Sequence, residues 1–240
     1  MTDATETPAT GEAEAADAPA SKAERQAQKL IRRQKRNLRK AGAEGFLRGV
    51  CAMLKPGDLA LDCGANMGVV TAQLAATGAD VVAYEPDPFA FARLAERFAD
   101  TPNVTLVNAA VAARAGTVTL MRAENFDANP EGASVKSTIL DGGRAIDARN
   151  GIEVPCLDFL EILRRESAAR GPVAFVKMDI EGAELEILEA MVGGDLSAGV
   201  RCLVAETHER KFRDLRDRFR ALRKTVSEDP RLGHINLDWI

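Results

Sequence analysis

Several ionisable side chains lie close together in the stretch VKMDIEGAE, which ends an apolar run. Asp179, Glu181 and Glu184 are spaced within about one helical turn, and Lys177 precedes them. Carboxylates held this close can raise one another's pKa and can remove a proton from a bound hydroxyl group. Acids at these positions could instead cap the helix that follows. We favour a catalytic role for Asp179 and Glu181 and a capping role for Glu184.

His208 follows a second apolar run, in VAETHE, and is one of only two histidines in the chain. Its ordinary pKa lies near neutrality, which makes it a candidate general base. A structural or exposed histidine explains the same position, so both interpretations stay open. Asp179, Glu181, Glu206 and His208 could bind a divalent ion, because oxygen-rich sites suit magnesium. No ligand spacing demands one, and we expect no metal.

A third polar cluster follows the apolar residues 59–61, in LDCGANMG. Gly64 and Gly68 remove side chains from a turn, so the backbone there can bend sharply and approach a ligand. The N–H groups at the start of the next helix would point toward that ligand. The glycine pair alone is equally well explained as a tight turn with an acidic cap. Asp62 and Asn66 beside it favour a binding site.

Glu85 ends the next apolar run, seventeen residues after Gly68. A carboxylate there can accept hydrogen bonds from both hydroxyls of a ribose, as an adenosine ligand requires. A dinucleotide site has the spacing G-x-G-x-x-G, whereas this chain has D-x-G-A-N-x-G. Asp62 would repel a pyrophosphate but attract the cationic methionine part of S-adenosylmethionine. Charge therefore favours S-adenosylmethionine as cofactor, with an NAD-dependent dehydrogenase as the least favoured enzyme class.

The elements that must position these residues alternate along the chain. Short apolar runs too short for helices are expected to form buried parallel strands, and they cover residues 59–61, 81–84, 104–107, 173–178 and 202–205. Helical periodicity follows four of them, over residues 69–76, 89–98, 183–191 and 209–224. This alternation predicts an α/β fold with a doubly wound, mostly parallel sheet.

The alternation is interrupted after the third strand. Residues 117–122 and 152–156 are expected to be strands, residues 157–169 a helix, and 123–151 a long polar loop. A loop of this length in a compact domain is more often functional than structural, so we interpret it as a substrate lid. Basic residues in or beside it would suit an anionic acceptor or simply be solvated (Arg122, Lys136, Arg144 and Arg149). The tail, residues 235–240, is expected to be an antiparallel edge strand.

The ends of the chain and its composition define the domains. Residues 1–21 are acidic and poor in apolar side chains, so a disordered tail is expected there. A basic helix over residues 22–45 and a globular domain over 46–240 follow. The helix either binds an anionic partner or is a solvent-exposed helix that precedes the domain, and we favour the second interpretation. Four scattered cysteines and the lack of a leader or a long apolar window indicate a cytoplasmic protein with no membrane span.

The chain resembles the FkbM family of S-adenosylmethionine-dependent methyltransferases. The resemblance rests on LDCGANMGVVTAQLA, VVAYEPDPFAFARL, VTLVNAAV, IEVPCLDFL and VAFVKMDIEGAELEIL, in that order. It implies a class I (Rossmann-like) methyltransferase fold whose seven-stranded sheet ends in a reversed hairpin. It also implies O-methylation, which members of the family perform on natural products and bacterial surface saccharides.

The resemblance also assigns roles to individual residues. It implies that the methionine part of the cofactor is held by Asp62, Gly64, Asn66 and Gly68, and the ribose by Glu85. Asn108 and Ala109 are expected beside the adenine, with Pro86 and Asp87 shaping that end of the site. The resemblance further implies that Asp179 and its neighbours face the transferable methyl group.

Other functions remain as alternatives. The chain could bind S-adenosylmethionine or a protein partner without catalysis, and the basic helix would then be its binding element. Nucleic-acid methylation is disfavoured, because the fourth strand ends in KMDIEG and the chain has only one Trp and one Tyr for base stacking. We expect a small-molecule or saccharide acceptor and no nucleic acid. The identity of the acceptor and the oligomeric state are left open by the sequence.

Overall fold

The computed structural model describes residues 21–126, 128–130, 134, 137–140 and 146–239. The chain divides into two compact units, residues 1–38 and residues 39–240. In the first unit the described residues are the N-terminal part of helix α1, all of them exposed. The tail expected over residues 1–21 lies, apart from Ser21, outside the described residues. The rest of the architecture belongs to the second unit.

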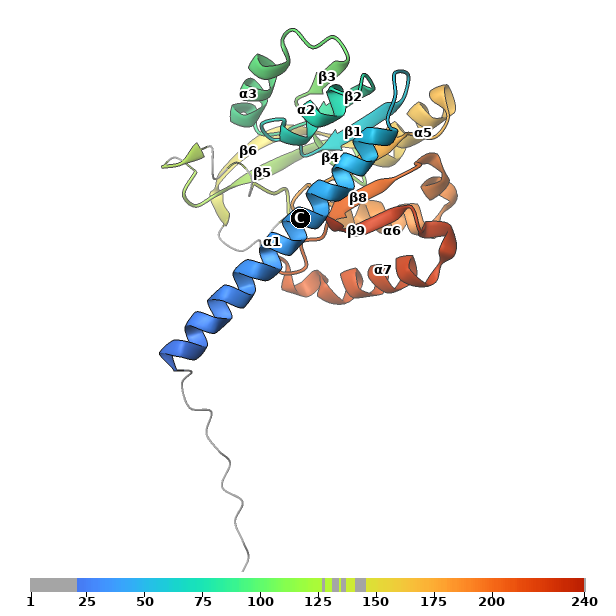
Figure 1. The fold of residues 1–240 in the computed structure, drawn as a ribbon. Helices are drawn as coiled ribbons and strands as arrows, with labels where there is room; N and C mark the ends of the chain where they lie inside the picture. Colours follow the sequence, from blue (N-terminus) through green and yellow to red (C-terminus); the bar gives the residue numbers. More distant parts are fainter. Residues whose placement is uncertain (1–20, 127, 131–133, 135–136, 141–145, 240) are drawn as a thin grey trace, which may run out of the picture. The chain divides into compact units, whose positions relative to one another are not determined.

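A six-stranded sheet forms the centre of the second unit (Figure 1). Every neighbouring pair in it is parallel. In spatial order the strands are β3 (Val104–Val107), β2 (Asp80–Tyr84), β1 (Leu59–Cys63), β7 (Phe175–Met178), β8 (Leu203–Glu206) and β9 (Ile235–Trp239). The chain starts at β1 in the middle and winds outward in both directions. The predicted doubly wound, mostly parallel α/β fold is confirmed.

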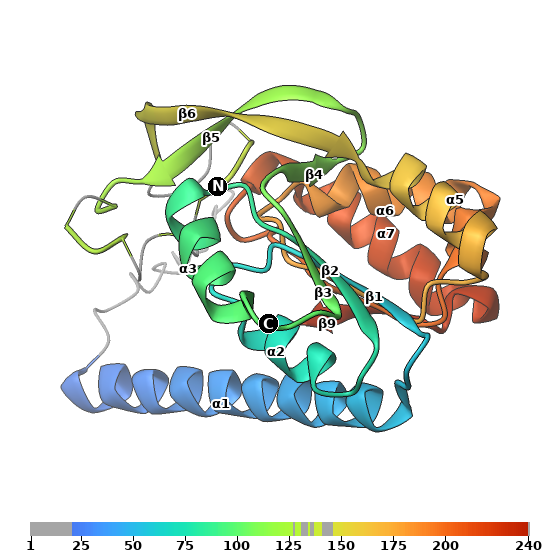
Figure 2. The same cartoon turned by 90° about the horizontal axis from the view of Figure 1, so that it is seen from above.

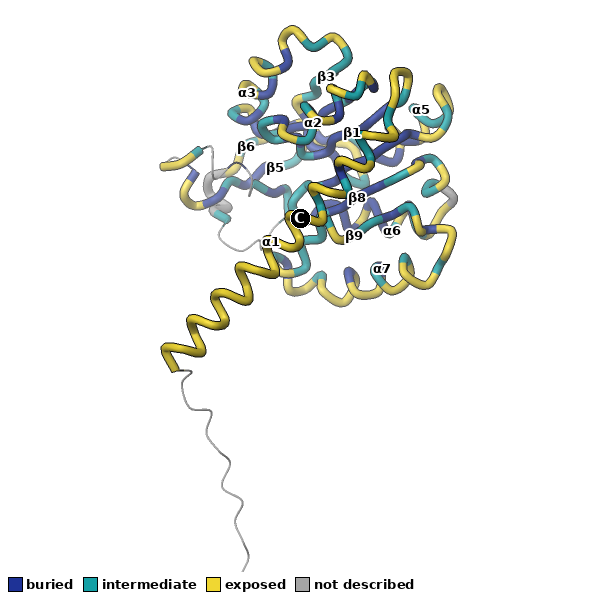
Figure 3. Tube along the Cα trace, viewed as in Figure 1, coloured by how far each residue is buried: buried dark blue, intermediate teal, exposed yellow. Residues whose placement is uncertain are grey.

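Helices cover both faces of this sheet (Figure 2). Successive strand side chains point to opposite faces. Leu61 and Val176 pack on the side of α5 (Phe159–Arg170) and α6 (Glu184–Gly193), where α7 (Arg216–Glu228) also lies. The opposite face is covered by α2 (Val69–Ala75), α3 (Pro88–Phe98) and the C-terminal part of α1 (Lys22–Met53). The central strands are therefore buried on both sides, as Figure 3 shows.

Helix α1 extends from Lys22 to Met53, so the expected end at residue 45 is wrong. The helix continues through Gly42 and Gly45, although each glycine costs about 1 kcal/mol relative to alanine. Burial of apolar side chains later in the helix offsets this cost, because Leu47 is buried in the core and Val50 packs against it. Within the described part of the chain, no helix is both long and apolar enough to span a membrane.

A smaller sheet stands beside the main one and interrupts its alternation. It consists of β4 (Ala110–Ala112), β6 (Ile146–Asp158) and β5 (Gly116–Ala123), and β5 pairs with β6 antiparallel. Strand β6 begins six residues earlier than the expected strand at 152, so the long loop is shorter than predicted. Pairing with β5 decides this, since β5 offers a partner at Arg122 and Ala123.

The C-terminal strand β9 corrects a further expectation. It lies at the edge of the main sheet, as expected, but it runs parallel to β8, whereas the sequence favoured an antiparallel strand. Helix α7 and the 3₁₀ turn Pro230–Leu232 carry the chain back along the sheet before β9 begins. That crossover returns the strand in the same direction as β8. Among the described residues the main sheet thus has six strands and not the seven-stranded form with a reversed hairpin.

Candidate active site

The turn from β1 into α2 is built by three residues with positive φ, namely Gly64 (φ 80°), Asn66 (φ 46°) and Gly68 (φ 75°). A Cβ atom on Gly64 would lie 1.9 Å from the carbonyl oxygen of Asp179, at the end of β7. A Cβ atom on Gly68 would lie 2.4 Å from the ring of Phe98 in α3. The two glycines therefore allow this turn to pack against neighbouring elements. Gly64 and Asn66 also line a cavity, and Gly68 does not.

Glu85 lies at the end of β2 and faces the same turn. Its two carboxylate oxygens accept backbone hydrogen bonds from Asn66 N at 2.8 Å and Asp87 N at 2.9 Å. The residue is 5% exposed, and burial raises its pKa to about 7 despite these hydrogen bonds. Each oxygen retains lone pairs for hydroxyl donors in the cavity that Glu85 lines.

Asp62 lies behind the turn and not in the cavity. Its side chain is fully buried and accepts a hydrogen bond from Thr71 Oγ1 at 2.6 Å. Lys177 Nζ lies 3.4 Å from Asp62 Oδ1 and donates to the carbonyl oxygen of Gly64 at 2.6 Å. Burial lowers the pKa of Lys177, but the charges of Asp62 and Asp179 outweigh it and raise the pKa. Asp62 thus holds the lysine that fixes the turn, and it is not among the residues that line the cavity.

Residues near the end of β2 divide into two groups. Pro86 and Ala109 line the cavity. The exposed Asn108 points its amide nitrogen back to the carbonyl oxygens of Glu85 and Pro86, at 2.8 and 3.2 Å, and holds the end of β2 in place. Asp87 is buried, caps α3 at Phe89 N, and forms a bidentate ion pair with Arg122.

The cavity opens at the carboxyl ends of β1, β2 and β7 and encloses about 630 Å³, including its mouth. One part of the wall is apolar and includes Val111 and Ile139. Three carboxylates line it, Glu85, Asp179 and Glu181, and among the described lining residues there is no lysine or arginine. The charge of this cavity suits a cationic ligand and opposes a phosphate.

Described residues of the loop between β5 and β6 contact both ends of this cavity. Asn66 Nδ2 donates to Ser134 Oγ at 3.3 Å, next to the β1 turn. Thr138 Oγ1 donates to the carbonyl oxygen of Glu181 at 2.7 Å, and Thr138 also bridges to Met121 of β5. The loop residues Lys136 and Arg144, singled out from the sequence, and the side chain of Arg149 lie outside the description. Four described residues of the loop line the cavity (Ser134, Ser137, Thr138 and Ile139), and the role of the loop as a lid stays a prediction.

A cluster of ionisable groups surrounds His208 at the carboxyl ends of β7 and β8. His208 Nδ1 lies 2.8 Å from Glu184 Oε1, while Nε2 lies 3.4 Å from Glu181 Oε2 and 3.8 Å from Asp179 Oδ1. Lys211 Nζ donates to Glu181 Oε2 at 2.7 Å. The structure therefore brings together the three residues predicted to be catalytic.

Burial and charge shift the pKa values in this cluster. Burial lowers the pKa of His208, but the hydrogen bond and charge of Glu184 and the charges of Glu181 and Asp179 outweigh it and raise the pKa to about 9. Burial, followed by the charge of Asp179, raises the pKa of Glu206 to about 7. Burial also raises the pKa of Glu181. His208 in this arrangement is protonated at neutral pH, so it must lose a proton before it can act as a base.

Two residues have larger roles than the sequence suggested. Glu184 stands at the start of α6 and accepts from Gly182 N, as a cap would, but it is also fully buried and bonded to both His208 Nδ1 and His208 N. Lys211, which the sequence did not single out, anchors Glu181. The only sequence signal for Glu184 was its distance from Glu181, and the pairing with His208, 24 residues away, needs the tertiary fold.

Comparison with known proteins gives a family for the chain. The family model described as "Methyltransferase FkbM domain" matches residues 62–228. A ribosomal RNA small subunit methyltransferase A of Thermotoga neapolitana is 47% identical over 55 residues, which are 23% of this chain and 21% of that protein. The chain thus spans about a fifth of the length of this curated relative.

Two solved structures are also similar in part. A TehB-like SAM-dependent methyltransferase from Corynebacterium glutamicum is 28% identical, with 33% of this chain and 42% of that chain covered and a TM-score of 0.22. A Burkholderia thailandensis 1,6-didemethyltoxoflavin-N1-methyltransferase is 17% identical, with 64% and 81% covered and a TM-score of 0.20. These superpositions are loose, so the assignment rests on the family model and not on them. Because that model matches residues 62–228 of the 240, the chain belongs to the FkbM methyltransferase domain family.

Proposed function

We propose that the protein is an O-methyltransferase that uses S-adenosylmethionine to methylate a hydroxyl group of a saccharide or secondary metabolite. The choice of this cofactor rests on the charge of the cavity at the carboxyl ends of β1, β2 and β7. Glu85, Asp179 and Glu181 line it, and no described lining residue is cationic. S-adenosylmethionine, when bound, supplies an electrophilic methyl group on a positively charged sulfur.

The residues of the cavity fit the parts of this cofactor. The buried carboxylate of Glu85 receives the ribose hydroxyls, and the apolar wall near Ala109 and Val111 suits the adenine. Gly64 and Asn66, which also line the cavity, would hold the methionine part. Asp62, which is fully buried, supports this end through Lys177, which pairs with it and donates to the carbonyl oxygen of Gly64.

The acceptor would enter from the side of His208. A second cavity there is lined by Glu206, His208, Lys211 and Trp239, among other polar residues, and suits a hydroxylated acceptor. Asp179 and Glu181 line the cofactor cavity and also lie 3.8 and 3.4 Å from His208. These positions support a role for both residues in orienting the acceptor hydroxyl toward the methyl group and in taking its proton. Such alignment supplies much of the acceleration in group transfer.

The experiment has two stages. Calorimetry with S-adenosylhomocysteine first measures cofactor binding, and incubation with S-adenosylmethionine and a panel of hydroxylated acceptors then measures methyl transfer by mass spectrometry. Asp179→Asn should lower turnover more than cofactor affinity, whereas Asp217→Asn, at an exposed ion pair with Arg220, should change neither. Binding without transfer to any acceptor would favour the non-catalytic binding module. Transfer to RNA, the substrate class named for the Thermotoga relative, would contradict a small-molecule or saccharide acceptor.

A further inference from the structure

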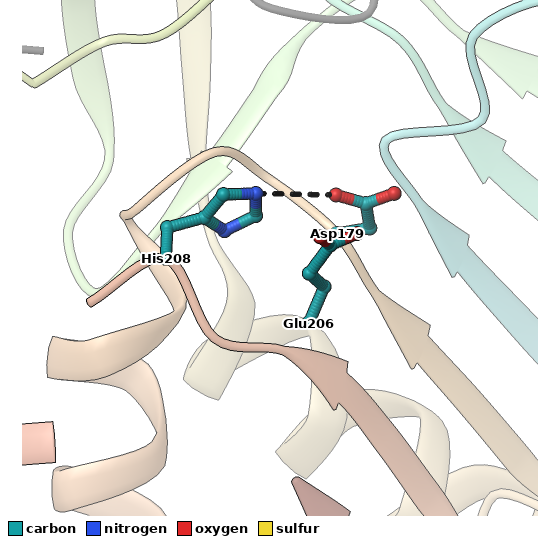
Figure 4. Close-up of side chains that lie close together, drawn as sticks. All are labelled: Asp179, Glu206 and His208. Carbon is teal, nitrogen blue, oxygen red and sulfur yellow. Dashed lines mark ion pairs between the residues drawn. The ribbon is translucent and has the colours of Figure 1, made fainter. Parts of the chain in front are cut away.

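Three side chains of the types that bind metal ions meet at the carboxyl ends of β7 and β8. Asp179, Glu206 and His208 each direct one ligand atom into a common space, and these atoms all lie within 4.8 Å of one another. Figure 4 shows the imidazole of His208 directed toward the carboxylate of Asp179, with Glu206 extending from β8 into the same space. His208 Nε2 and Asp179 Oδ1 lie 3.8 Å apart. Two ligand atoms on one ion can be separated by about 3 to 4 Å, because metal–ligand distances are near 2 Å.

The orientation of His208 is fixed from behind. Its Nδ1 atom pairs with Glu184 Oε1 at 2.8 Å, and the same oxygen accepts from His208 N at 3.2 Å. Glu184 is itself fully buried and held by Gly182 N. A carboxylate bonded to the outer nitrogen of a histidine is the usual arrangement behind a metal-binding imidazole, because it fixes the ring and its tautomer.

The front of the ring has no comparable partner. The His208 side chain is 10% exposed, and Nε2 forms no hydrogen bond among the described residues. It faces carboxylate oxygens of Glu181 and Asp179 at 3.4 and 3.8 Å. Only a cation at Nε2, a proton or a metal ion, makes this arrangement attractive.

The charges around this space do not balance. Among the described residues, five carboxylates surround it or connect to it through ion pairs (Asp62, Asp179, Glu181, Glu184 and Glu206), against three cations, which are Lys177, Lys211 and the protonated imidazole of His208. The carboxylate of Glu206 makes no hydrogen bond or ion pair with any described residue, although it lies close to Asp179. Unpaired carboxylates in a partly buried site are costly unless a cation joins them.

We propose that Asp179, Glu206 and His208 bind a divalent metal ion beside the cofactor cavity. The mixed set of two carboxylates and one imidazole suits Mn²⁺ or a similar ion better than a purely oxygen-binding one. The ion shares Asp179 with the cavity wall, so it stands where an acceptor hydroxyl could reach it. This inference replaces the expectation, drawn from ligand spacing in the sequence, that no metal binds.

The test uses the full chain after removal of metals with a chelator, without cofactor or acceptor. Titration with Mn²⁺ alone, followed by electron paramagnetic resonance of the free ion, should give one site per chain. Asp179→Asn, Glu206→Gln and His208→Ala should each weaken Mn²⁺ binding at least about tenfold, and Glu184→Gln by about 10- to 100-fold through loss of ring orientation. Circular dichroism confirms that each variant is folded. Glu206→Gln is the mildest change, because that side chain has no described partner to lose.

The chain supplies its own control, because it has only two histidines. His234 pairs with the carbonyl oxygen of Ser197, just before β9 and away from this cluster. Pulsed resonance of bound Mn²⁺ should show the nitrogen coupling of an imidazole in the wild type and in His234→Gln, and should lose it in His208→Ala. The proposal is overturned if no Mn²⁺ binds, if any of the three ligand variants binds as tightly as the wild type, or if His234→Gln abolishes the coupling. These metal-binding measurements do not depend on methyl transfer, so this inference and the proposed function can fail separately.

Discussion

Glu85 offers the sharpest test of the cofactor site, because its charge should depend on pH within the range in which the protein can be studied. Burial raises its pKa from the ordinary 4.5 to about 7. Only the ionised form offers all of its lone pairs to ribose hydroxyls, since the proton of the neutral form occupies one of them. We therefore expect the affinity for S-adenosylhomocysteine to fall as the pH drops below about 7.

The size of the effect follows from the pKa. If binding needs the carboxylate, affinity falls by up to about tenfold for each pH unit below the pKa, so pH 6 and pH 8 should differ by roughly tenfold. In Glu85→Gln the dependence should vanish. The carboxylate of Glu85 accepts hydrogen bonds from both Asn66 N and Asp87 N, one on each oxygen. The glutamine amide has only one acceptor oxygen, so one of these N–H groups loses its partner. That loss should cost about 1–3 kcal/mol of unfolding free energy.

The same shift predicts how stability depends on pH. The folded chain holds the Glu85 proton more tightly than the unfolded chain, in which the pKa is near 4.5. The contribution of Glu85 to the unfolding free energy is therefore largest below about pH 4.5 and is lost as the pH rises to about 7. The loss is at most ~3 kcal/mol, and Glu85→Gln should lack it.

Calorimetric titration with S-adenosylhomocysteine between pH 5.5 and 8.5 measures the first effect, and urea unfolding from about pH 4 to about pH 8 measures the second. The variant Glu85→Gln reports any titration of the ligand or of other residues, so the difference between the two proteins isolates Glu85. Equal pH profiles for wild type and variant would refute the reasoning. Unchanged affinity in Glu85→Gln at pH 8 would remove this residue from the cofactor site.

Three further predictions concern the turn, its lysine and the N-terminal region. Gly64→Ala should destabilise the fold by ~3 kcal/mol or more, because its φ is 80° and its Cβ atom would lie 1.9 Å from the Asp179 carbonyl oxygen; a thermal melt that matches wild type would contradict this. Lys177→Met should cost about 3–5 kcal/mol in urea unfolding, because it leaves the buried Asp62 charge without its cation, and Lys177→Met combined with Asp62→Asn should recover part of the loss. Deletion of residues 1–38 should change the unfolding free energy by less than ~0.5 kcal/mol, since its described residues are exposed; a large drop in melting temperature would show that this region supports the fold.

Local patterns were enough to predict the strands and helices of the main sheet. Short apolar runs bounded by turn residues became β1, β2, β3, β7 and β8, because strands in the middle of a parallel sheet are covered on both faces and therefore carry mostly apolar side chains. The direction of β9 could not be predicted in this way. Its side chains alternate whether it is parallel or antiparallel, and the crossover through α7 decides.

The candidate site, like the fold, was predicted only in part from the sequence. The sequence determined which residues lie at the carboxyl ends of the strands. Glu85 and Asp179 each follow an apolar run directly, and His208 follows β8 after Thr207. Only the tertiary structure decided which way their side chains face. It buried Asp62 against Lys177, turned Asn108 back onto β2, and placed Glu184 behind His208. Strand periodicity fixes position along the chain, whereas these pairings join residues far apart in sequence, and their geometry depends on how the sheet and helices pack.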